Sequence, residues 1–400
     1  MLAENPPGLR LGWVLSVDPA VPALSASTHS SAHPCRATAT AAAAAASGHG
    51  QAEHWESRLS ISTAAGVERQ HGTGWPHLRL TPNYVPAGMM STAAKLDSMN
   101  RALDYTILDV FAEHPLEGNP LAVFHDARGL SDAQMQAIAR ETNLSETTFV
   151  LPSADPDRDR AEGVRVRIFT TQEELPFAGH PTLGTASWLH LNHPPLLGAR
   201  EFKLLLNVGP INVRVEPQPD SGAVFATMWH NDAVFGETYD RAEVAAVLGL
   251  SPSDLLEHAP PQTVSTGNPF CIVALQLEAL RRLAIPQREA CAWLAAQRTR
   301  WFYCVAPEQA SEPTNVWRAR MQFYSGEDPA TGSAAGCAIA WLVRHGLAES
   351  GREVTLRQGL EIGRPSRLVV RAVRQEEGVG SITVSGSTIP VARGAFFLPV

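Results

Sequence analysis

The sequence predicts an α+β protein built from two copies of one strand-rich unit, each copy surrounding a buried helix. The first observation is a repeated Gly-Asn-Pro turn, at residues 118–120 and 267–269, between short strand patterns. The second is a Gly/Ala-rich helix start, which follows the turn glycine by 61 residues at Gly179 and by 65 residues at Gly332. Matched turns at matched spacing indicate an internal duplication, and a helix that is apolar on nearly all sides is buried. An unduplicated α+β fold with similar local patterns is the alternative that these patterns leave open.

The first copy starts near Asp104 and contains two predicted helices. Residues 130–142 carry apolar side chains at helical spacing, with Ser131 as the expected N-cap. Residues 182–189 form a helix of small and apolar residues, opened by Phe177-Ala178-Gly179-His180-Pro181. Strands are expected at residues 105–111, 121–124, 147–151, 164–170, 202–208 and 211–215.

The second copy repeats this order. A helix is expected at residues 287–297, with Cys291, Leu294 and Ala295 on one side. A second helix runs from Thr331 to Val343 and is again rich in glycine and alanine. Strands are expected at residues 262–265, 270–275, 301–305, 316–324, 354–357 and 367–370.

Residues 1–102 differ from the rest, being rich in Ala, Ser, His, Pro and Gly with little periodicity. We expect a disordered extension, because such a segment buries too little apolar surface to offset the entropy of ordering it. Residues 9–17 faintly resemble a signal-peptide core, and a transit peptide is another alternative. A third alternative is a true start at Met89, Met90 or Met99.

Composition excludes several classes of partner. The net charge is −8, so no basic surface for nucleic acid or anionic membrane is indicated, and no apolar run is long enough to span a bilayer. The five cysteines show no C-x-x-C spacing, which favours neither a zinc site nor disulfides and is typical of core residues in a reducing, cytoplasmic compartment. Residues 326–332 lack the spacing and the lysine of a phosphate-binding loop, and no serine-hydrolase elbow, H-E-x-x-H or dinucleotide motif occurs.

The two glycine-rich helix starts are candidate anion sites. The first turn of a helix leaves backbone N–H groups without partners, and small residues let an anion approach them closely. Ala178-Gly179-His180 and Gly332-Ser333-Ala334 occupy equivalent places in the two copies, so we expect them to face each other across a cleft. The pair suits a small substrate that carries a carboxylate. The alternative is that the small residues only allow close packing of helix on sheet.

Glu146 is the candidate general acid/base. It lies at a strand start among residues typical of a core, where partial desolvation would raise the pKa of its carboxyl group. Only the first copy has this acid, because Arg298-Thr299-Arg300 occupies the matching place in the second. His180 is either a donor to substrate or a turn histidine, and Asp328 either caps the second helix or orients a substrate amine or hydroxyl. An exposed strand-end carboxylate remains the alternative for Glu146.

As a set, these segments closely resemble the phenazine-biosynthesis PhzF-like family, over about residue 103 to the C-terminus. The segments that carry the resemblance are Asp109-Val110-Phe111, Glu117-Gly118-Asn119-Pro120, Asn143-Leu144-Ser145-Glu146-Thr147-Thr148-Phe149, residues 175–186 and residues 327–336.

The resemblance implies the fold of diaminopimelate epimerase: two pseudo-symmetric domains, each a mixed sheet or barrel wrapped around a central helix. We place these domains at residues 103–220, completed by strand 388–400, and at residues 221–387. Related epimerases carry a catalytic cysteine at each helix start, whereas this chain has Gly179-His180 and Gly332-Ser333, so a two-thiol racemase mechanism is not expected.

The resemblance also implies site roles and partners. Glu146, with His180 and Asp328, would be catalytic, and Ser145, Gly179, Gly332 and Ser333 would bind substrate. The family implies an isomerase that moves a proton within a dihydro-hydroxyanthranilate, uses neither cofactor nor metal and forms a homodimer. Two alternatives stay open: a non-catalytic protein that binds a small carboxylate, and an epimerase or lyase acting on another substrate.

Overall fold

A computed structural model describes residues 100–218, 222–309, 315–323 and 326–399. They all lie within one compact unit, residues 81–400. The extension expected at residues 1–102 lies outside the described residues, except that residues 100–102 begin the first strand. Among the described residues, no helix has both the length and the hydrophobicity needed to cross a membrane.

The elements of the described unit follow the expected order, with several short additions. The first half comprises β1 (Asn100–Val110), β2 (Asn119–Phe124), α2 (Asp132–Thr142), β3 (Glu146–Leu151), α3 (Pro156–Glu162), β4 (Val164–Phe169), β5 (Glu174–Leu175), α4 (Gly179–Asn192), η1 (Pro194–Leu196), β6 (Glu201–Leu206), β7 (Gly209–Gln218) and β8 (Ala223–Trp229). The second half comprises β9 (Val234–Thr238), α5 (Arg241–Val247), η2 (Pro252–Asp254), β10 (Gln262–Ser265), β11 (Pro269–Ala274), α6 (Leu277–Arg281), α7 (Gln287–Ala296), β12 (Trp301–Pro307), β13 (Val316–Arg320), β14 (Gln322–Phe323), β15 (Gly326–Glu327), α8 (Gly332–Arg344), β16 (Val354–Gln358), η3 (Leu360–Ile362), β17 (Ser366–Gln375) and β18 (Gly378–Pro399).

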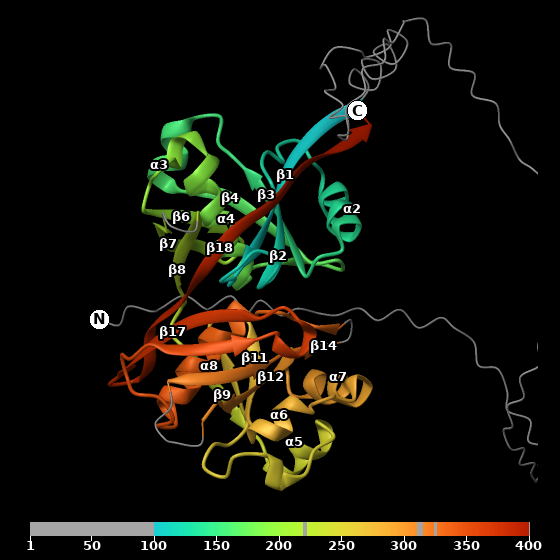
Figure 1. Cartoon of the computed structure of the whole chain (residues 1–400), viewed down its shortest axis with the longest axis vertical. Helices are drawn as coiled ribbons and strands as arrows, with labels where there is room; N and C mark the ends of the chain where they lie inside the picture. Colours follow the sequence, from blue (N-terminus) through green and yellow to red (C-terminus); the bar gives the residue numbers. More distant parts are fainter. Residues whose placement is uncertain (1–99, 219–221, 310–314, 324–325, 400) are drawn as a thin grey trace, which may run out of the picture. The chain divides into compact units, whose positions relative to one another are not determined.

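Strand β18 joins the two halves into one mixed sheet. Its start pairs with β17, residues 383–388 pair with β8, and residues 388–399 pair with β1. The pairings β1-β2-β3-β4-β6-β7-β8-β18-β1 therefore close a ring of strands in the first half. The strands from β17 to β9 extend the sheet through the second half, and Figure 1 shows β18 passing from one half to the other.

The predicted duplication is visible in the strand pairing. In the first half β2–β3 and β4–β6 are parallel, with α2 and α4 on the respective connections. In the second half β11–β12 and β13–β16 are parallel, with α6 and α7 on the first connection and α8 on the second. The mixed, sheet-rich α+β class predicted from the sequence is confirmed.

The two glycine-rich helices are buried, as their composition predicts. Nearly every residue of α4 and of α8 is inaccessible to solvent. Small residues are required there, because a Cβ on Gly184 would lie 2.5 Å from a methyl group of Leu121, and one on Gly336 would lie 2.3 Å from the ring of His230. Close packing thus accounts for part of the small-residue pattern within both helices.

Several local predictions need correction. The buried residues of α7 are Ala290 and Leu294, whereas Cys291 and Ala295 are exposed. The single strand expected at residues 316–324 is interrupted at Met321, so that Gln322–Phe323 pairs in a separate two-stranded sheet with Gly326–Glu327. Helices α3, α5 and α6 and strands β8 and β9 were not predicted, because short elements carry little periodicity. Ser131 does cap α2, in a capping box with Gln134.

Candidate active site

Glu146 is placed by the end of α2 and the start of β3. Asn143 ends the helix in the left-handed conformation, with a φ of 50°, which asparagine tolerates better than most residues. The chain then enters β3, where Glu146 is paired with Leu121 of β2. The hydroxyl groups of Thr142 and Thr147 lie 2.7 Å apart and join the helix end to the strand. The carboxyl group is therefore carried by a rigid strand start.

The carboxyl group of Glu146 is shielded from water. Its side chain is 16% exposed, and its Oε2 atom is buried without a hydrogen-bond partner. Burial, together with the negative charge of Asp328, raises its pKa well above the usual value. The alternative of a solvent-exposed strand-end carboxylate is wrong for this residue.

His180 lies beside this carboxyl group. Its Nδ1 atom lies 3.5 Å from Oε2 of Glu146, and the ring is 3% exposed. Burial lowers the pKa of His180 to about 3, so the imidazole is neutral at physiological pH. Its Nε2 atom is buried without a partner. The pair is thus a neutral histidine beside a carboxyl group of raised pKa rather than a charged ion pair.

Asp328 follows β15 and is 8% exposed. Its Oδ1 atom accepts hydrogen bonds from Nδ2 of Asn119 (2.8 Å) and from Oγ of Ser145 (3.2 Å). Its Oδ2 atom accepts one from Oγ1 of Thr331 (2.6 Å). Burial raises the pKa of Asp328, while these three donors lower it. Because Glu146 lacks such donors at Oε2, Asp328 is the carboxylate that stays ionised when the two share one proton.

The expectation that Asp328 caps α8 is wrong. The N-cap of α8 is Thr331, and no side chain caps the helix. Asp328 lies three residues before Thr331 in the chain and accepts a hydrogen bond from the Thr331 hydroxyl group instead. Gln358, which is fully buried, accepts from the Thr331 backbone N–H at 3.1 Å and donates to the Asp328 carbonyl at 2.8 Å.

Asn119 is a site residue that the sequence reasoning did not assign. Besides Asp328, its Nδ2 atom lies 2.9 Å from the carbonyl oxygen of Ala330 and 3.3 Å from Nδ1 of His180. In the second half, Nδ2 of Asn268 donates to the carbonyl of Phe177 at 3.0 Å. Each asparagine of the repeated Gly-Asn-Pro thus binds the carbonyl two residues before the central helix of the other half. The sequence did contain a signal for this role, since Gly-Asn-Pro occurs at matched places in both halves, although the motif by itself predicts only a turn.

The two helix starts meet directly. Gly179 and Gly332 are in contact, since a Cβ on Gly179 would lie 2.6 Å from the backbone N of Ser333 and 2.7 Å from Cα of Gly332. Neither α4 nor α8 has a side-chain cap, so their first N–H groups converge on one region. The two starts do lie together, but in direct contact rather than across a cleft as expected, and this contact requires glycine at position 179.

A cavity of about 320 Å³ lies in front of these groups. Four of the seven predicted site residues line it: Ser145, Glu146, Asp328 and Ser333. His180, Gly179 and Gly332 lie behind the lining, which includes Ala178 and Thr331 at the helix starts. The remaining walls combine aromatic side chains, among them Phe177, Phe270, Trp301 and Phe323, with polar ones such as Asn143, Thr170, Thr171 and Asn268.

The lining within the described residues contains carboxyl groups but no Lys, Arg or His side chain. An anion in this cavity would therefore depend on backbone N–H groups and on the Ser333 and Thr331 hydroxyl groups. In the described part of the chain, no three His, Cys, Asp or Glu side chains are arranged to hold a metal ion.

Residues 108–394 match the family described as phenazine biosynthesis-like protein, PhzC-PhzF. A trans-2,3-dihydro-3-hydroxyanthranilate isomerase from Pseudomonas aeruginosa is 38% identical over 304 residues, covering 74% of this chain and 99% of that protein. An uncharacterized isomerase from Mesorhizobium japonicum is 36% identical over 308 residues, covering 74% of this chain and 99% of that protein.

Solved structures share the fold. A predicted epimerase from Pseudomonas aeruginosa has a TM-score of 0.63 at 38% identity, covering 74% of this chain and 99% of that one. A Bacillus anthracis phenazine biosynthesis protein of the PhzF family has a TM-score of 0.65 at 24% identity, covering 74% of this chain and all of that one, and shows the fold alone.

Proposed function

The chain belongs to the phenazine biosynthesis-like family and is an isomerase, and we propose that it moves a proton between carbon atoms of a small cyclic or amino-acid-like carboxylate without a cofactor. The observation that carries this proposal is the Glu146 carboxyl group, which is buried at the cavity wall with Oε2 unpartnered and its pKa raised. Such a group gives up and takes back a proton near neutral pH more readily than an ordinary carboxylate.

In this mechanism Glu146 acts first as base and then as acid. In the fraction of molecules in which Glu146 has released its own proton, its carboxylate removes a proton from one substrate carbon, and the electron pair of that C–H bond moves into the conjugated system. The protonated Glu146 then returns the proton to a second carbon, so that a double bond has shifted and no atom is gained or lost. Proton transfer by a positioned side chain contributes about 10²–10⁴-fold to the rate.

The remaining groups hold the substrate and the charge that develops on it. We propose that the substrate carboxylate lies at the meeting helix starts, where unpaired N–H groups and the Ser333 hydroxyl donate to it. Asp328, ionised and lining the cavity, would accept from a substrate amine or hydroxyl. The aromatic walls suit a flat ring. The substrate named for the 38% identical relative, trans-2,3-dihydro-3-hydroxyanthranilate, combines a ring with these polar groups.

Deuterium exchange tests the proposal. The protein is incubated with trans-2,3-dihydro-3-hydroxyanthranilate in D₂O, and deuterium in substrate and product is located by NMR. Wild type is expected to catalyse isomerisation, and deuterium enters the new C–H position to the extent that the proton held by Glu146 exchanges with solvent before it is returned. Glu146→Gln is expected to lose at least 100-fold in rate. Glu141→Gln, which changes an exposed glutamate of α2, is the matched control and should retain full activity. An active Glu146→Gln variant would exclude this residue as the base, and exchange with no double-bond shift would indicate an epimerase.

We further propose that the protein acts in the cytoplasm, as a homodimer, without nucleic-acid or membrane partners. The net charge of −8 and the free thiols of Cys271, Cys304 and Cys337 support the compartment and the partner class. Sedimentation equilibrium at two protein concentrations tests the dimer.

A further inference from the structure

Two adjacent carboxyl groups, Glu327 and Asp328, line the same cavity. Glu327 ends a short hairpin, separate from the main sheet, in which Gln322 pairs with Glu327 and Phe323 pairs with Gly326, and Asp328 follows it. The backbone N–H of Asp328 donates to the Met321 carbonyl at 2.9 Å. The place of Asp328 in the cavity therefore depends on how this small hairpin is held.

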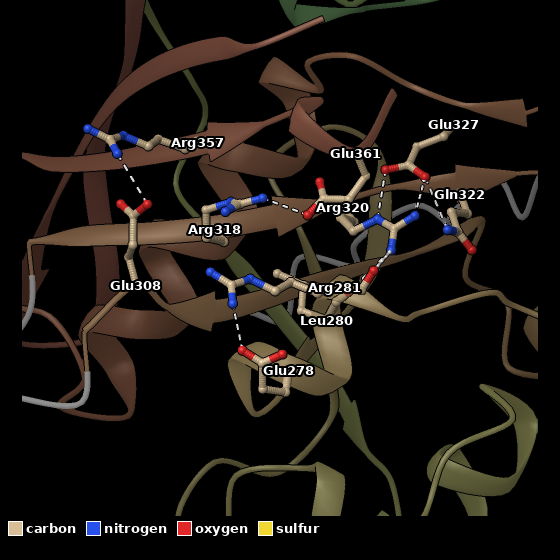
Figure 2. Close-up of polar contacts among 10 residues, drawn as sticks. All are labelled: Glu278, Leu280, Arg281, Glu308, Arg318, Arg320, Gln322, Glu327, Arg357 and Glu361. Atoms are coloured by element: carbon tan, nitrogen blue, oxygen red, sulfur yellow. Dashed lines mark hydrogen bonds and ion pairs between the residues drawn. The ribbon is translucent and has the colours of Figure 1, made fainter. Parts of the chain in front are cut away.

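Arg320, the last residue of β13, binds Glu327 of the hairpin (Figure 2). Its Nε donates to Oε1 of Glu327 at 2.8 Å and its Nη2 to Oε2 at 2.6 Å, which forms a bidentate pair. Its Nη1 donates to the backbone carbonyls of Leu280 (2.8 Å) and Arg281 (3.1 Å), at the end of α6. Both charged side chains are 8% exposed.

Gln322 completes this arrangement. Its Nε2 atom lies 3.1 Å from Oε2 of Glu327 and 2.8 Å from the carbonyl of Leu283, and its Oε1 atom accepts from the backbone N–H of Ile285 at 2.8 Å. The hairpin is thus joined to the end of α6 by Arg320 and to the segment after α6 by Gln322. A glutamate at the cavity wall is thereby paired with an arginine and neutralised.

A buried ion pair seldom adds net stability over apolar residues of the same volume, because both charges lose their hydration. We propose that Arg320 is a positioning residue of the isomerase: by holding Glu327 against α6 it fixes Asp328 in the cavity and cancels a negative charge beside it. This inference rests on the proposed function, in which Asp328 holds the substrate.

Loss of Arg320 has two expected consequences. The hairpin loses its bidentate attachment, and a misplacement of about 1 Å in a catalytic group costs about 10²-fold in rate. The charge of Glu327 is also left uncompensated. The charged or titratable groups that face Asp328 are then Glu146 from β3, Glu327 from β15 and Tyr303 from β12, so the added negative charge raises the pKa of Asp328.

The same strand offers a matched control. Arg318 lies two residues earlier in β13, and its side chain is also 8% exposed. It donates to Oε1 of Glu361 at 2.6 Å, while its own Nε and Oε2 of Glu361 have no partner. Neither Arg318 nor Glu361 lines the cavity. Figure 2 shows the two arginines side by side on β13 with their separate partners.

The experiment compares Arg320→Gln with Arg318→Gln, using trans-2,3-dihydro-3-hydroxyanthranilate as probe. We expect both variants to be destabilised, since each leaves a carboxylate without its arginine. Only Arg320→Gln should lose about 10–100-fold in kcat, with a smaller rise in KM and with the acid limb of the pH profile moved to higher pH. Arg318→Gln should keep kcat within twofold of wild type.

Arg320→Lys distinguishes the effect of the lost geometry from the effect of the lost charge. It also replaces Arg320→Gln in the experiment if that variant does not fold. Lysine keeps the positive charge but loses the planar fork, so its pH profile should match wild type while kcat stays at least threefold reduced. Equal kcat losses in Arg318→Gln and Arg320→Gln, or wild-type kcat in either Arg320 variant, would overturn the positioning role. A wild type that does not turn over the probe would instead refute the proposed function, and this role with it.

Discussion

Replacement of Glu146 by glutamine is expected to stabilise the protein while it removes activity. The glutamate carboxyl group is buried, with Oε2 unpartnered and a second carboxylate nearby, so its ionised form is disfavoured in the folded state. Glutamine has nearly the same shape and no charge to bury. The side chain that serves proton transfer thus weakens the fold that carries it.

The size of the effect follows from proton linkage. The folded-state pKa of Glu146 lies above the unfolded value of about 4.5, so between these values the folded state binds more protons than the unfolded state. The contribution of Glu146 to the free energy of unfolding of wild type therefore falls as pH rises, by up to about 1.4 kcal/mol for each pH unit in this window. Above the folded-state pKa the loss stays constant. Glu146→Gln does not undergo this loss.

The assay is urea unfolding of wild type and Glu146→Gln at several pH values between 4 and 9. The advantage of the glutamine variant should be near zero below the unfolded pKa and should grow with pH. Glu141→Gln on the exposed face of α2 is the control and should show no pH-dependent difference. A difference between wild type and Glu146→Gln that is independent of pH would refute the argument that this carboxyl group is desolvated.

Two further outcomes follow from packing. Gly179→Ala should lower the free energy of unfolding by about 1–3 kcal/mol or more, because its Cβ would lie 2.6 Å from the Ser333 backbone. Gly332→Ala should lower it less, because the nearest contact of its Cβ is at 3.1 Å. Equal losses in urea unfolding would contradict this order. In native Cys35→Ser protein, a maleimide should label Cys291 rapidly, whereas the buried thiols of Cys271, Cys304 and Cys337 should react only after unfolding. Mass spectrometry of the labelled peptides measures this, and rapid labelling of a second cysteine would contradict the burial.

Local patterns predicted most of the scaffold because they are short-range. The capping box at Ser131, the burial of α4 and α8 and the repeated Gly-Asn-Pro all arise from residues within a few positions of one another. Predictions failed where tertiary contacts determine which residues are buried. In α7, for example, the buried face depends on the elements that pack against the helix.

The candidate site divides in the same way. The sequence alone indicated Glu146, Asp328 and the two helix starts as candidate site residues. An acid present in only one of two copies, and small residues at a helix start, can be recognised from the order of residues without a structure. It assigned no role to Asn119, whose amide meets Asp328 across 209 residues of chain.

The sequence by itself determined the fold class, the duplication and which segments enclose the helices, since these depend on hydrophobic periodicity and turn chemistry. Only the tertiary structure decided the electrostatics of the cavity. Whether a carboxyl group keeps or releases its proton depends on the groups around it, and folding brings those groups together from distant parts of the chain. Asp328 gains three hydrogen-bond donors, Glu146 keeps an oxygen without a partner, and Glu327 is neutralised by Arg320.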